Sequence, residues 1–244
     1  MTRLGLVSLA TALGLAGCGL ARAEPAADPP LVLSASSLTE VLSRIEPDGR
    51  YSFAGSNQLA QQIRLGAPFD VFLSASPLYT QDLYREGLLR KPVAFASNSL
   101  VLVVPRSNPQ RIRTVSDLAK RPKLRLVVAG PTVPIGLYTR QVLKRLGLLR
   151  VLKKAVSLEP DVKGVVGKVA LGEADAGFVY RTDVRPVARK VRVIALPRVS
   201  QPTVTYEAAI AAQPQSVESA RAFLSALLST AGRRALRAAG FGVP

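Results

Sequence analysis

Short apolar runs alternate with longer segments of helical periodicity along most of the chain. Apolar runs bounded by turn residues predict buried strands, and apolar positions that recur every three or four residues predict helices. The predicted strands are 31–33, 50–53, 71–73, 99–104, 124–129, 153–158, 176–180, 191–196 and 204–211. The predicted helices are 38–45, 58–65, one beginning near 77, 115–120, 137–146, 162–171, 216–228 and 231–239. Strands that alternate with helices form mostly parallel sheets covered by helices on both faces, so the pattern predicts an α/β fold.

The order of these segments predicts two lobes. We expect residues 31–99 and 205–244 to form the first lobe and 100–204 to form the second, each a mostly parallel sheet flanked by helices. Two crossings, near 99–104 and 204–211, join the lobes and predict a hinge with a cleft. Ligands of open α/β sheets bind beyond the carboxyl ends of the strands, so the cleft is the expected site.

Residues 1–23 have the pattern of an export signal, with Arg3, an uncharged apolar stretch and small residues. Two cleavage sites remain open: residues 15–18 resemble a lipoprotein box that leaves a lipidated Cys18, and 21–23 fit ordinary signal peptidase. An uncleaved membrane anchor is the alternative. Residues 24–30 form a Pro-rich tether. We expect a protein in the periplasm or on the outer face of the cytoplasmic membrane.

The composition disfavours several kinds of catalytic site. The chain has no histidine, which excludes Ser-His-Asp triads and histidine-based metal sites. Cys18 is the one cysteine and lies in the leader, so the exported body has no disulfide and no thiolate cluster. A hydrolase that uses serine with lysine as base remains the enzymatic alternative.

The positive charge of the chain is concentrated in the second lobe. The formal net charge is +17, and residues 100–204 contain 21 Lys and Arg against 6 Asp and Glu. A nucleic-acid-binding module is one interpretation of this charge. The basic residues are scattered singly with few aromatic residues between them, so we favour a solvated lobe whose field draws small anions toward the cleft.

Four predicted strand-to-helix turns and one strand end share a capacity to donate hydrogen bonds without carrying a charge. Backbone N–H groups at helix starts lack intrahelical partners and attract anions. None of the turns places a Lys or Arg within it, so together they suit a small, fully deprotonated anion. Ser37 and Ser56 as plain helix caps, and Tyr180 as a core residue, are the alternatives. The five positions are Ser36-Ser37, Gly55-Ser56-Asn57, 133–136, Pro160-Asp161-Val162 and Tyr180.

Six phrases distributed over residues 31–243 resemble one family, the periplasmic molybdate-binding proteins of ATP-binding-cassette importers. The phrases are SASSLTE at 34–40, FAGS at 53–56, QQIRLGAPFDVFLSA at 61–75, NSLVLV at 98–103, VPIGLY at 133–138 and GEADAGFVY at 172–180. The resemblance implies a two-lobed periplasmic binding protein of type II. It also implies that five groups hold the metal as an oxyanion: the hydroxyls of Ser37, Ser56 and Tyr180 and the backbone N–H groups of Ile135 and Val162.

Three positions depart from the family pattern. Ile135 stands where the family usually has alanine, which keeps the backbone donor but adds bulk. Asp161 places a carboxylate beside the expected anion unless it caps its helix. Glu207 replaces a proline after Tyr206, a change that bears on the hinge.

The resemblance implies a non-enzymatic protein that binds molybdate, or tungstate, and delivers it to the membrane permease of an importer. We expect a monomer without cofactors, catalytic residues or nucleic-acid partners. A binding protein for sulfate or another small anion on the same fold is the first alternative. The Ser/Lys hydrolase and the nucleic-acid-binding protein are the remote ones.

Overall fold

The structure is a computed structural model that describes residues 28–244. The predicted export signal with Cys18, and most of the tether, lie outside the described residues. Within 28–244 no helix has the length and apolar character needed to cross a bilayer.

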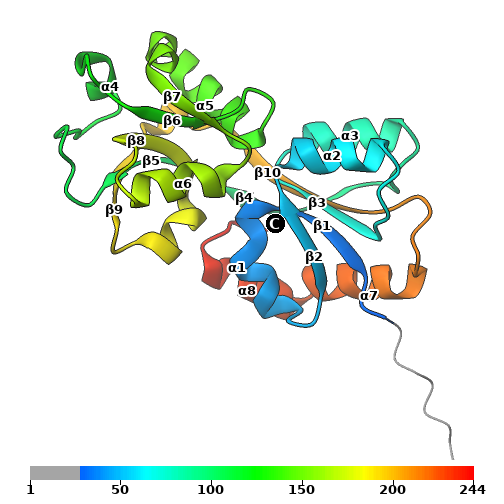
Figure 1. Ribbon diagram of the computed structural model, residues 1–244. Coiled ribbons are helices and arrows are strands. Elements are labelled where there is room, and N and C mark those ends of the chain that lie inside the picture. Colours follow the sequence, from blue (N-terminus) through cyan, green and yellow to red (C-terminus); the bar gives the residue numbers. More distant parts are fainter. Residues whose placement is uncertain (1–27) are drawn as a thin grey trace, which may run out of the picture.

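The first lobe is a five-stranded sheet with helices on both faces (Figure 1). Its strand order is β2-β1-β3-β10-β4, with the first three strands parallel and β10 antiparallel to both of its neighbours. The strands are β1 (Leu31–Ala35), β2 (Arg50–Ala54), β3 (Val71–Ser74), β4 (Val93–Asn98) and β10 (Val204–Ile210). Helices α2 (Ser56–Arg64) and α3 (Pro77–Arg85) cover one face; α1 (Thr39–Ile45), α7 (Val217–Leu228) and α8 (Thr230–Ala239) cover the other.

The second lobe repeats this arrangement with the strand order β7-β6-β8-β5-β9. Again three strands are parallel, and the fourth runs antiparallel to its neighbours. The strands are β5 (Leu100–Pro105), β6 (Leu126–Ala129), β7 (Ala155–Glu159), β8 (Ala176–Tyr180) and β9 (Val191–Ala195). The helices are α4 (Asp117–Lys120), α5 (Pro134–Arg145) and α6 (Val162–Ala170), with 3-10 turns η2 (Leu149–Lys154), η3 (Arg181–Val187) and η4 (Arg198–Ser200). The predicted two-lobed α/β class is therefore confirmed.

Two segments differ from the prediction for local reasons. Strand β4 was not predicted, because only Phe95 and Ala96 of its six residues are buried and the apolar signal is weak. Helix α5 begins at Pro134, three residues before the predicted start at 137. Proline is well suited to the first helical turn, where its missing N–H costs no intrahelical bond, so residues 134–136 of the predicted turn already belong to the helix.

The chain crosses between the sheets at two points that are tied to each other. Ser99 alone separates β4 from β5, and η4 lies between β9 and β10. The Gln201 side chain, which follows η4, donates to the carbonyl of Leu100 at 2.8 Å and accepts from its N–H at 3.0 Å. This pair of bonds makes the two crossings act as one connection.

Asp70 ties together distant parts of the first lobe. Its carboxylate is 2% exposed and accepts from the backbone N–H groups of Leu31 at 2.8 Å, Gln215 at 2.7 Å and Ser216 at 3.2 Å. These bonds reach the start of β1 and the loop before α7, both far from Asp70 in the sequence.

We therefore predict that Asp70→Ala lowers the free energy of unfolding by about 3 kcal/mol, since it leaves three donors without their charged acceptor in a buried place. Urea unfolding followed by circular dichroism measures this. Asp48→Ala, at an exposed position in the turn after α1, is the control and should change stability by less than about 0.5 kcal/mol. Equal effects of the two substitutions would contradict the role assigned to Asp70.

Candidate functional site

One cavity between the lobes is lined by all five residues that the sequence singled out. It lies at the carboxyl ends of the parallel strands of both sheets, and the space in it that admits the centre of a water-sized sphere is about 10 Å³. This is about the space that one water molecule needs and far below the range of about 300–1,000 Å³ of pockets for drug-sized ligands, so the cavity suits only a small ligand. Its walls are formed by Ala35, Ser36, Ser37, Ala54, Gly55, Ser56, Ala75, Val133, Pro134, Ile135, Asp161, Val162 and Tyr180.

Three α-helices from both lobes begin at this cavity (Figure 1). Helix α2 starts at Ser56, α5 at Pro134 and α6 at Val162, and each presents first-turn N–H groups that lack intrahelical acceptors. Because Pro134 has no N–H, Ile135 supplies the first donor of α5. The positive ends of the helix dipoles add a field that favours an anion at the point where the helices meet.

The two serine hydroxyls are held by neighbours within the first lobe. Ser56 Oγ accepts from the backbone N–H of Ala75 at 3.1 Å, which leaves its own proton free to donate. Ser37 lies in η1 (Ser36–Leu38), and its Oγ is 2.9 Å from the hydroxyl of Tyr206 on β10. Both serines are almost completely buried, so their remaining hydrogen-bonding capacity faces the cavity and not bulk water.

Tyr180 contributes a buried hydroxyl with no protein partner among the described residues. It ends β8, is 1% exposed, and packs edge-on against the rings of Tyr138 and Tyr206. Burial raises the pKa of Tyr180 well above its usual value, so the phenol stays protonated and acts as a donor. An unpaired buried hydroxyl costs free energy, which an acceptor in the cavity would recover.

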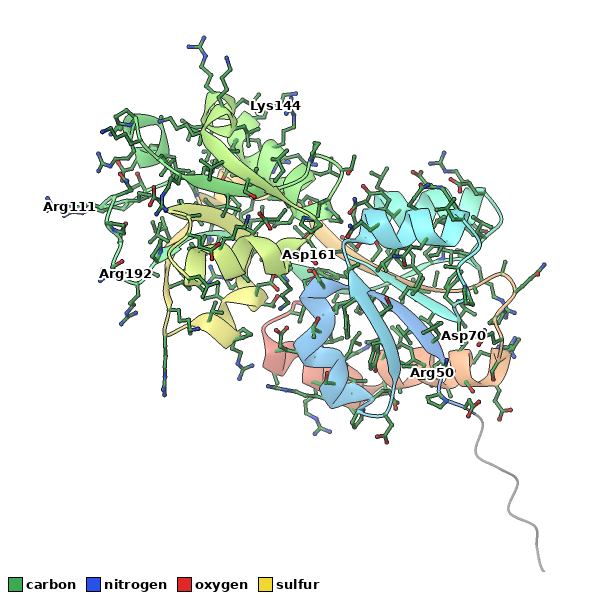
Figure 2. The ribbon with its side chains drawn as sticks, viewed as in Figure 1. Arg50, Asp70, Arg111, Lys144, Asp161 and Arg192 are labelled. Atoms are coloured by element: carbon green, nitrogen blue, oxygen red, sulfur yellow. The ribbon has the colours of Figure 1, made fainter. Side chains whose placement is uncertain are left out.

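Asp161 also lines the cavity, and its carboxylate is bound to the start of α6. It caps this helix, where its Oδ1 accepts from the N–H of Gly164 at 3.0 Å (Figure 2 labels this residue). The negative charge therefore stabilises the helix start. Of the three departures from the family pattern, Asp161 is thus accommodated, and Ile135 adds its side chain to the cavity wall.

Gly55 and Gly136 are needed for close backbone approach, not for turn conformation. A Cβ atom on Gly55 would lie 2.5 Å from the carbonyl oxygen of Pro160, in the other lobe. A Cβ atom on Gly136 would lie 2.1 Å from the carbonyl oxygen of Gly130. Neither glycine has a positive φ angle, so neither position needs glycine for its backbone conformation. Gly55 allows the lobes to touch beside the cavity.

A further contact between the lobes is made by the residue after Val162. Lys163 Nζ is 2.7 Å from Glu40 Oε1 on α1 and 3.1 Å from Asp183 Oδ1 on η3. Burial disfavours the ammonium, but Asp183 and Glu40 outweigh it and raise the pKa of Lys163. The sequence pattern gave no signal for this lysine, which directly follows a proposed donor. Its charge is directed to carboxylates, as only the packing of the lobes could show.

Comparisons with known proteins identify the family and the fold. A family of bacterial extracellular solute-binding proteins matches residues 31–242. The molybdate-binding protein ModA of Mycobacterium tuberculosis is 35% identical over 98% of this chain and 97% of the relative. The solved structure of the periplasmic molybdate-binding protein of Azotobacter vinelandii superposes with a TM-score of 0.77 at 23% identity, over 88% of this chain and 99% of that one.

The same fold carries other ligands. The sulfate-binding protein SubI of Mycobacterium tuberculosis has a TM-score of 0.75 at 15% identity, over 86% of this chain and 85% of that one. At this identity the likeness concerns the fold alone.

We predict that Gly55→Ala holds the lobes apart, because the added methyl group meets Pro160 only when they close. Overpacking of this kind costs about 1–3 kcal/mol. Small-angle scattering with saturating molybdate should give a larger radius of gyration for the variant than for the wild type. Gly167→Ala, where a Cβ meets no atom within 4 Å, is the matched control and should scatter like the wild type. Indistinguishable curves for all three proteins would contradict the contact.

The buried carboxyl of Asp183 predicts a pH-dependent stability. Burial raises the pKa of Asp183 to about 7, against the opposing attraction of Lys163, whereas an unfolded aspartate titrates near about 3.9. Between these values the folded protein holds a proton that the unfolded chain has lost, so stability falls as the pH rises toward 7. The free energy of unfolding of the ligand-free wild type, minus that of Asp183→Asn, should decrease from pH 5 to pH 8. A constant difference over this range would show that Asp183 does not titrate there.

Proposed function

This chain belongs to the ModA-type molybdate-binding family of bacterial extracellular solute-binding proteins, and we propose that it captures molybdate in the cavity between its lobes. The proposed ligands are the hydroxyls of Ser37, Ser56 and Tyr180 and the backbone N–H groups of Ile135 and Val162. All five residues line the cavity. Tungstate, which has the same tetrahedral shape and charge, is expected to bind in the same way.

The observation that carries the proposal is the unpaired hydroxyl of Tyr180, buried among helix N-termini in a cavity whose one carboxylate, that of Asp161, caps α6. Such a site offers mainly donors, so it favours an anion without protons. Phosphate near neutral pH keeps a proton in much of its population, and that proton finds no partner in the cavity. Sulfate has no such proton and has to be discriminated by size.

The rest of the proposal concerns delivery. An extracytoplasmic solute-binding protein presents its ligand to a permease, and the lobes closed around the ion form the surface that the permease of an ATP-binding-cassette importer recognises. We propose a monomer without catalytic activity, held at the membrane by a lipid on Cys18 if cleavage follows Gly17. A lysine base for serine chemistry has little support, because Lys163, which follows the donor Val162, is paired with two carboxylates.

Sulfate is the second candidate ligand, and Ile135 is the observation that favours it. Its side chain lines the cavity where alanine is usual in the family, and a narrower cavity would admit a smaller tetrahedral ion. Isothermal titration of residues 24–244 with molybdate, tungstate, sulfate and phosphate distinguishes the ligands. The proposal expects molybdate and tungstate to bind most tightly; tighter binding of sulfate would assign the protein to that anion, and equal binding of phosphate would refute the donor-only site.

We predict that Ser37→Ala and Ser56→Ala each weaken molybdate binding by about 1.5–3 kcal/mol, the range for a lost hydrogen bond to a charged group. Ser43→Ala is the matched control, since Ser43 is exposed on α1 and bonds to the carbonyl of Thr39. Titration calorimetry measures all three affinities. If both cavity variants bind as tightly as Ser43→Ala, the site is not the one proposed.

A further inference from the structure

Three hydrogen-bonded side chains, Asn98, Tyr206 and Ser37, lead from the first crossing between the lobes to the cavity. Asn98 is the last residue of β4, and its Nδ2 is 3.4 Å from the hydroxyl of Tyr206 on β10. The hydroxyl of Tyr206 is in turn 2.9 Å from Ser37 Oγ. Neither Asn98 nor Tyr206 lines the cavity, so neither was a candidate ligand.

The direction of the hydrogen bonds in this line is determined at its outer end. Asn98 Oδ1 accepts from the backbone N–H of Ser99 at 2.9 Å, and a backbone N–H can only donate. The amide oxygen is therefore committed to Ser99, and the NH₂ group has to face Tyr206 and the Thr182 hydroxyl, which is 2.9 Å away. The NH₂ group cannot accept a proton from Tyr206.

The proton of Tyr206 then has one acceptor. Tyr206 is 0% exposed, and burial raises the pKa of its phenol, so the proton stays on the oxygen. The side-chain bonds of its oxygen in the described structure go to Asn98, which only donates, and to Ser37. Leaving a buried O–H unpaired is costly, so Tyr206 donates to Ser37 Oγ.

From this order we infer that Asn98 and Tyr206 are positioning residues that keep the proton of Ser37 available to the bound anion. Because Tyr206 donates to Ser37 Oγ, Ser37 does not use its own proton on Tyr206 and can donate it into the cavity. The inference rests on the proposed function and adds the origin of one of its donors. A serine that donated its proton to Tyr206 would present only lone pairs to the anion.

The line also connects the site to the arrangement of the lobes. Asn98 belongs to the first lobe, while Thr182, which shares its NH₂ group, lies in η3 of the second. The NH₂ group is therefore held between the lobes at the crossing. The direction in which Ser37 donates its hydrogen bond is therefore determined where the two lobes meet.

The test reverses the direction of the hydrogen bonds along this line with a side chain of nearly the same size. In Asn98→Asp, one oxygen keeps the bond from Ser99 and the other accepts from Tyr206, so Tyr206 donates outward and Ser37 has to donate to Tyr206. Ser37 then presents only lone pairs to the anion. In Tyr206→Phe the hydrogen bond to Ser37 is lost, and the Ser37 hydroxyl is free to rotate. In the double variant the carboxylate is present, but it has no hydroxyl through which to act on Ser37.

Titration calorimetry with molybdate and with inorganic phosphate, on folded protein verified by circular dichroism, compares the four proteins. We expect Tyr206→Phe to lose about 3- to 10-fold in molybdate affinity and Asn98→Asp at least about 100-fold, the larger loss reflecting a donor converted into an acceptor. Adding Tyr206→Phe to Asn98→Asp should restore about 10-fold or more. The preference for molybdate over phosphate should fall most in Asn98→Asp.

A purely structural role, or simple repulsion by the new carboxylate, predicts a double variant that binds no better than Asn98→Asp. That result would overturn the inference while leaving molybdate binding by the wild type, and with it the proposed function, intact. Failure of the wild type to bind molybdate would instead overturn the proposed function and the inference with it.

Discussion

Buried hydrogen-bond donors that have no protein acceptor are the constraint on which the arrangement of this molecule depends. The starts of α2, α5 and α6 and the hydroxyl of Tyr180 meet in one cavity between the lobes. Buried donors without partners cost free energy, and a bound anion removes that cost from both lobes at once. The closed arrangement and the anion thus stabilise each other, which is what a protein that closes around its ligand requires.

The charges around the cavity are arranged so that none of them replaces these donors. Asp161 is turned to cap α6, and Lys163 is directed to Glu40 and Asp183. The strong positive charge of residues 100–204 is carried by scattered side chains, and Figure 2 shows labelled Arg111, Arg192 and Lys144 at the outer end of the second lobe. Long-range attraction of anions is therefore separate from their recognition, which relies on oriented neutral donors.

The two sheets share one design, and each receives a strand from the chain as it arrives from the other lobe. β5 and β10 lie at equivalent places in their sheets, antiparallel to the third parallel strand. The carboxyl ends of the parallel strands, and the helices that follow them, face the same cleft. Because Gln201 binds Leu100 through both backbone groups, the crossings move together, and the lobes have one connection about which to open.

Local pattern by itself determined the order of strands and helices and the residue types at their junctions, since hydrophobic period and turn chemistry are properties of neighbouring residues. It therefore pointed to the four strand-to-helix turns and to Tyr180, and the family resemblance then selected Ser37, Ser56, Ile135 and Val162 within the turns. Local pattern missed β4, whose residues are mostly not buried. Only the tertiary structure decided that these residues share a cavity, that Gly55 touches Pro160 and that Tyr206 reaches Ser37. Such contacts join residues more than a hundred positions apart, and they depend on how two lobes pack, which no local period encodes.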